Sequence, residues 1–226
     1  MSGIWPFLGV LIVIAILYLA ELRWPDGVTR FEENVLAILL ALITFVSFTQ
    51  VIARYGFNSG WGGALEFTRI LFAWMILFGM SYGLKQGMHL GVDALVRLFP
   101  KALFRYVAIF GAFCAFLYGA ILLSSGWLAV VGIDTKGGAL TYWQTMYKVG
   151  IGLDDLRWPE WVQSTFGTKE RVQRWIAYLI LPVGLGLFSF RALQAMVAIW
   201  RGEREMVIAG HEAEELVAEN RDVLKD

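Results

Sequence analysis

Residues that crosslink a chain or bind metals are scarce in this sequence. Its 226 residues include one cysteine, Cys114, and two histidines, His89 and His211. A single cysteine excludes an internal disulfide and a cysteine-based metal cluster. Neither histidine lies inside a long apolar run, which argues against a haem held by two histidines within the membrane. We therefore expect no cofactor and no metal, and we expect Cys114 to be a small buried apolar side chain.

Charge is also scarce. Asp, Glu, Lys and Arg make up 17% of the chain, against ~25% in soluble proteins. The 19 basic and 19 acidic residues cancel, so nothing indicates the basic surface of a nucleic-acid-binding protein. Hydrophobic residues reach 58%, and the mean hydropathy is +0.61. This composition excludes an ordinary soluble enzyme and is typical of an integral membrane protein.

Five long apolar runs predict helices that cross a bilayer. Such a helix needs about 20 apolar residues, and it satisfies its own backbone hydrogen bonds in lipid. The runs are residues 4–20, 34–53, 61–84, 106–133 and 175–200. We therefore predict an all-α integral membrane protein with four core transmembrane helices and an additional N-terminal hydrophobic helix.

The first run is the shortest and allows three interpretations. It is a retained span, an interfacial helix or a cleaved signal peptide, although no basic residue precedes it. We divide the chain into an N-terminal helix and linker (1–32), a membrane domain (33–200) with a long outer loop (134–174), and a polar tail (201–226).

The positive charges between the runs predict the orientation. If all five runs span, one side holds ten Lys or Arg residues: Arg23, Arg30, Lys85, Arg97, Lys101, Arg105, Arg201, Arg204, Arg221 and Lys225. The other side holds six: Arg54, Lys136, Lys148, Arg157, Lys169 and Arg171. The richer side is expected to be cytoplasmic. The C-terminal tail is then cytoplasmic, and residues 134–174 lie outside, either flat on the membrane or against a soluble partner.

Two pairs of polar residues could carry chemistry. Glu66 and Arg69 lie on one face at the start of a predicted span, and charges there tend to be paired or functional. We expect them to pair with each other, or to fix the helix against another subunit. His89 and Asp93 are four residues apart, but a metal site needs three or four ligands. An interfacial hydrogen-bonded pair is the simpler interpretation.

Glycines recur every four residues at Gly79, Gly83, Gly87 and Gly91, which predicts a surface where helices approach closely. Arg191 in the last run is expected to reach the interface or to find a partner. We find no paired nucleophile and base, no phosphate loop and no zinc signature. The sequence therefore gives no basis for an enzyme.

Residues 34–93, which include the second and third runs, carry a combined pattern. It comprises Gln50, Arg54, Asn58, Trp61, Glu66, Arg69, Trp74, Gly79, Gly83, His89 and Asp93, followed later by Leu181-Pro182-Val183-Gly184 and Arg191. Over residues 34–200 this resembles the small membrane subunit (DctQ type) of tripartite ATP-independent periplasmic (TRAP) transporters. The segment 151–156 is similar to members that serve C4-dicarboxylates.

The resemblance implies a non-catalytic subunit of a sodium-coupled transporter in a bacterial inner membrane. Its implied partners are a large TRAP membrane subunit, a periplasmic substrate-binding protein and membrane lipid, with no nucleic acid. It also implies that Arg54, Asn58, Trp61, Glu66 and Arg69 lie near the periplasm, and that His89 and Asp93 lie near the cytoplasm. Two alternatives stay open: a membrane anchor of a redox enzyme complex, and a small transporter or channel acting alone.

Overall fold

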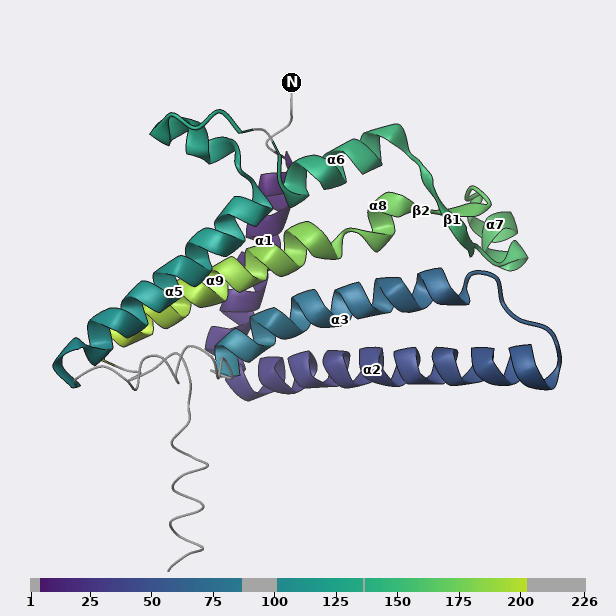
Figure 1. Ribbon diagram of the computed structural model, residues 1–226, viewed down its shortest axis with the longest axis horizontal. Coiled ribbons are helices and arrows are strands. Elements are labelled where there is room, and N and C mark those ends of the chain that lie inside the picture. The colour runs from purple at the N-terminus through teal and green to yellow at the C-terminus, as the bar shows by residue number, and fades with distance from the viewer. Residues whose placement is uncertain (1–4, 87–100, 136, 203–226) are drawn as a thin grey trace, which may run out of the picture. The chain divides into compact units, whose positions relative to one another are not determined.

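The computed structural model describes residues 5–86, 101–135 and 137–202 (Figure 1). Within these ranges, five helical stretches are long and apolar enough to cross a membrane. They are α1 (Trp5–Arg23), α2 (Pro25–Gly56), α3 (Ala64–Gln86), α5 (Lys101–Leu123), and α8 (Arg174–Ala177) continuing into α9 (Ile180–Arg201). The predicted all-α, multi-pass membrane fold is confirmed.

Helix α2 is longer than its apolar run. It begins at Pro25, a residue suited to the first helical position because its missing N–H would have no partner there. The negative charge of Asp26 in the first turn interacts favourably with the positive end of the helix dipole. The polar residues before the run at 34–53 are therefore helical, and the division between residues 32 and 33 falls inside one continuous helix.

The run at 106–133 does not form one helix. Helix α5 ends at Leu123, and Gly126–Val131 forms a short 3-10 helix that closes on Gly132 in the left-handed conformation (φ 82°). The backbone N–H of Ser125 instead donates to the carbonyl oxygen of Gly137 at 3.1 Å. The serine pair before Gly126 therefore ends the span.

The contacts divide the chain into two units, the first of which comprises residues 1–79 and 120–187. Two glycines of α9 allow close approach there. A Cβ atom on Gly184 would lie 2.8 Å from the Cβ of Leu77 in α3, and one on Gly186 would lie 2.6 Å from a methyl group of Val10 in α1. The start of α9 thus packs against both α1 and α3.

The second unit comprises residues 80–119 and 188–226. Its described core joins the end of α3, most of α5 and the rest of α9 through Leu84, Ala108, Ala112, Phe188, Ala192 and Ile199. Gly119 of α5 leaves no room for a side chain, because a Cβ atom would overlap the Ser189 hydroxyl and lie 2.9 Å from the Phe188 ring. Arg191 is buried, and its guanidinium donates to the Gln194 side chain at 2.8 Å.

The long loop at 134–174 contains secondary structure of its own. It forms α6 (Ala139–Val149), β1 (Gly152–Arg157), α7 (Glu160–Phe166) and β2 (Arg171–Gln173). Strands β1 and β2 pair in an antiparallel ribbon. Helix α6 buries Ala139, Leu140 and Trp143 on one side, so it is amphipathic. The sequence did not lead us to expect the strands.

Candidate functional site

The turn between α2 and α3 is fixed by one side-chain amide. Gln50 accepts a hydrogen bond from the backbone N–H of Trp61 at 3.1 Å, and its amide nitrogen donates to the Trp61 carbonyl oxygen at 3.2 Å. Asn58 takes the left-handed conformation (φ 45°) that lets the chain turn back. The Gln50 side chain thus holds the loop at residues 57–63 against the last turns of α2.

A cleft of about 570 Å³ opens beside this turn. Helix α2 contributes Ser47, Gln50 and Arg54, which share one face because they are three and four residues apart. The rest of the lining comes from the loop and from the start of α3: Asn58, Ser59, Gly60, Trp61, Gly62, Ala64, Leu65 and Thr68. We call this the α2–α3 cleft. Three of the residues singled out by the sequence, Arg54, Asn58 and Trp61, meet here.

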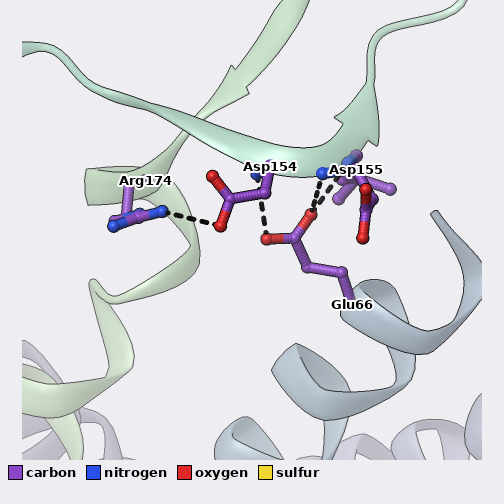
Figure 2. Close-up of polar contacts among 5 residues, drawn as sticks. Glu66, Asp154, Asp155 and Arg174 are labelled. Atoms are coloured by element: carbon purple, nitrogen blue, oxygen red, sulfur yellow. Dashed lines mark hydrogen bonds and ion pairs between the residues drawn. The ribbon is translucent and has the colours of Figure 1, made fainter.

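Glu66 lies at the start of α3 and binds the backbone of strand β1 (Figure 2). One carboxylate oxygen accepts from the N–H of Asp154 at 3.2 Å. The other accepts from the N–H groups of Asp155 and Leu156, both at 2.8 Å. Hydrogen bonds to a charged acceptor are stronger than neutral ones. This three-bond contact, which we call the Glu66 anchor, ties the loop at 139–173 to α3.

The ribbon beside the Glu66 anchor is supported by apolar packing and by an ion pair. Leu153, Leu156, Val172 and Ala177 are buried together, with Phe67 and Ile70 of α3 packed against them. Arg174 donates to the Asp154 carboxylate at 3.3 Å (Figure 2). Gly63 lets the chain come close, since a Cβ atom there would lie 3.1 Å from the Asp155 carbonyl oxygen.

Four aromatic rings join α1, α6 and α8. The rings of Trp5, Trp143, Tyr147 and Trp175 have neighbouring centroids 5.4–6.3 Å apart. The indole N–H of Trp143 donates to the Trp175 carbonyl oxygen at 2.9 Å. We call this group the aromatic cluster. It fixes the beginning of the N-terminal helix against the amphipathic helix of the long loop.

The structure corrects two sequence expectations. Glu66 and Arg69 do not form an ion pair in the described chain, because the Glu66 carboxylate is directed to the strand while Arg69 is exposed. Cys114 is exposed rather than buried, because it lies on the face of α5 turned away from buried Ala108 and Ala112. An exposed apolar face is what a helix in lipid or beside another subunit presents.

The expected glycine surface is only partly described. Gly79 and Gly83 lie in α3, and a Cβ atom on Gly79 would lie 3.5 Å from Leu36 of α2, an ordinary contact. Gly87, Gly91, His89 and Asp93 lie outside the described residues. Among the described glycines of the five long helical stretches, the tightest contacts occur at Gly119, Gly184 and Gly186. We did not predict these as packing positions, although the Gly-Leu-Gly sequence in the last run is a usable signal.

A group of three His, Cys, Asp or Glu residues able to hold a metal ion is absent from residues 5–86, 101–135 and 137–202. Both histidines fall outside these ranges. The α2–α3 cleft offers hydrogen-bonding groups and the positive charge of the exposed Arg54.

Comparison with known proteins gives consistent matches. Residues 43–202 match the family model described as "Tripartite ATP-independent periplasmic transporters, DctQ component". A protein of Vibrio cholerae named "C4-dicarboxylate TRAP transporter small permease protein DctQ" is 33% identical over 214 residues, covering 89% of this chain and 87% of that protein. A Pseudomonas aeruginosa protein of the same name is 28% identical, over 77% of this chain and 85% of that protein. No solved structure gives a significant match.

Proposed function

The chain belongs to the DctQ family of tripartite ATP-independent periplasmic transporters, and we propose that it scaffolds the large membrane subunit and helps dock the substrate-binding protein. It is a multi-pass bacterial membrane protein and a subunit of a transporter. In the proposed arrangement, the large subunit carries the substrate and the coupling sodium ions. The small subunit supplies a fixed surface beside it.

The observation that carries the proposal is the Glu66 anchor. Without secondary structure, a loop as long as that at 134–174 would present no defined surface for a partner. Here three hydrogen bonds to a carboxylate and a buried apolar group fix the ribbon to a membrane helix. A fixed ribbon is suited to contact a soluble partner, because its backbone need not be ordered when the partner binds.

The proposed substrate class is the C4-dicarboxylates, taken up together with sodium ions. Support comes from the names of the Vibrio cholerae and Pseudomonas aeruginosa relatives, which both refer to C4-dicarboxylates. In the proposed orientation, the loop at 134–174 and residues Arg54, Asn58, Trp61, Glu66 and Arg69 face the periplasm. The C-terminal tail lies in the cytoplasm of a cell whose inner membrane holds the complex.

Affinity purification from native membranes in mild detergent, followed by mass spectrometry, tests the scaffold role. We expect a large polytopic membrane protein to co-purify in stoichiometric amount. Deleting this chain should abolish sodium-dependent succinate uptake, while supplying it in trans should restore uptake. Uptake that persists without the chain would refute the proposal.

A glycine variant tests the packing surface. Gly83→Leu should reduce co-purification of the large subunit, because a long side chain prevents close helix approach. Gly9→Leu is the matched control, since a Cβ atom on Gly9 would have nothing within 4 Å. Equal recovery of the large subunit with both variants would show that Gly83 does not lie at the interface.

The redox-anchor alternative is not favoured by the family match. It predicts haem or quinone in the purified complex, and an absorbance spectrum from 350 to 600 nm would detect haem. A Soret band that follows this chain through purification would revive that alternative.

A further inference from the structure

The α2–α3 cleft lies where a helix leaves the hydrocarbon. Residues 34–53 of α2 carry no charge. At ~1.5 Å per residue they span about 30 Å, the thickness of the bilayer core. Arg54, the first charge after them, lines the cleft. We propose that this cleft binds the phosphate-bearing headgroup of a membrane phospholipid, with the Arg54 guanidinium as the cation that holds the phosphate.

The charge of the cleft favours an anion. Arg54 is the one ionisable residue in the described lining. No carboxylate of the described chain forms an ion pair with it. The nearby Glu66 carboxylate points to the N–H groups of β1 instead. A guanidinium can donate two parallel hydrogen bonds to phosphate oxygens, so Arg54 leaves a phosphate-binding position open.

The remaining polar groups suit a headgroup. The described lining includes the hydroxyl-bearing residues Ser47 and Ser59 and the amide of Asn58. The Gln50 amide is already engaged with Trp61, so it shapes the cleft wall. A volume of about 570 Å³ falls within the range of small-ligand sites, which is ~300–1,000 Å³. A phosphate with its glycerol is of a size that such a cleft accommodates.

An apolar surface continues from the cleft along both helices. On α2, Phe48 and Val51 each follow a lining residue and are 64% and 54% exposed. On α3, Leu65 lines the cleft, and Phe72, two turns further along, is also exposed. Acyl chains attached to a bound headgroup would cover these exposed apolar side chains. A free phosphate ion would leave them uncovered, which is why we assign the anion to a lipid.

Native mass spectrometry of the full-length chain tests the assignment without any transport assay. The protein is purified in mild detergent and titrated with phosphatidylglycerol. Arg54→Gln should weaken binding of the first lipid about tenfold, as expected for one lost charge-assisted contact. Arg54→Lys should retain part of the affinity, because it keeps the charge without the planar fork. Arg69→Gln makes the same charge change outside the cleft lining, and its affinity should stay within about twofold of the unchanged chain.

A second variant and a soluble competitor complete the experiment. Gly62→Leu fills the cleft from a position where a Cβ atom would have nothing within 4 Å. It should also weaken lipid binding, and it carries the test if Arg54→Gln does not fold. Inorganic phosphate at millimolar concentration should not displace the lipid. Equal weakening by Arg54→Gln and Arg69→Gln, unchanged affinity in both cleft variants, or displacement by phosphate would each overturn the proposal.

Discussion

The indole ring of Trp5 lies edge-on against that of Trp143, with 5.4 Å between the ring centroids. The same Trp5 ring lies 5.5 Å from that of Tyr147. Further along α1, Val10 occupies the space that Gly186 leaves open. Aromatic pairs of this geometry are worth about 0.5–1.5 kcal/mol beyond the area that they bury. The beginning of α1 is therefore held at the same end of its unit as α6.

This relationship predicts the topology of the N-terminus. If α1 spans the bilayer beside α9, a tag fused before Met1 should lie on the same side as a tag inserted after Gly167 in the long loop. A tag after Asp226 should lie on the opposite side. Protease protection in oriented vesicles measures all three positions. An α1 that rests on the cytoplasmic surface would instead place both terminal tags on one side.

Replacing Glu66 should loosen the ribbon. In Glu66→Gln the amide NH₂ replaces one acceptor oxygen, so it faces a backbone N–H that it cannot accept from. We expect a loss of about 1–3 kcal/mol in stability. Hydrogen exchange at the amides of Asp154–Leu156 should become faster. Glu160→Gln, an exposed residue of α7, is the control. Exchange rates and melting temperature equal to those of the control would contradict the Glu66 anchor.

Gly119→Ala should destabilise the unit that contains α5 and α9. The added methyl group would overlap the Ser189 hydroxyl and press on Phe188. Overpacking of this kind costs about 1–3 kcal/mol. Thermal unfolding in detergent should show a lower melting temperature. Gly9→Ala, where the structure leaves open space in α1, should be neutral or slightly stabilising because alanine favours helix. A neutral Gly119→Ala would show that the helices are further apart than described.

The ion pair between Arg157 and Glu170 should matter little. Its atoms lie 2.6 Å apart, but the side chains are 59% and 60% exposed. Exposed pairs contribute about 0–1 kcal/mol. Arg157→Ala should therefore shift the melting temperature less than Glu66→Gln. In about 1 M salt, where the screening length is ~3 Å, that small shift should disappear. A shift as large as that of Glu66→Gln would show that the pair is a main support of the ribbon.

The membrane spans could be predicted from the sequence because their cause is local. A long apolar run favours a helix in lipid, because the helix satisfies its own backbone hydrogen bonds there. The ends of the helices could be predicted less well. Helix α2 extends back to Pro25 and α5 stops at Leu123, since polar flanks and a serine pair act through hydrogen bonds that hydropathy does not register.

For the site, the sequence could predict which residues lie near one another but not the contacts they make. The sequence pattern groups Arg54, Asn58 and Trp61, and these residues line one cleft. The partner of Glu66 could not be inferred, because it is the backbone of a strand 88–90 positions later. Local spacing suggested Arg69 instead. Contacts between residues so distant in the chain depend on tertiary packing, which one sequence does not specify.

The Glu66 anchor has a consequence for how this family can diversify. The carboxylate recognises main-chain N–H groups, which nearly every amino acid supplies. At position 155, where the side chain is exposed, any residue except proline keeps its hydrogen bond to Glu66. The surface that the ribbon offers to the outside can therefore change its chemistry from one relative to another while its attachment to the membrane helix stays the same.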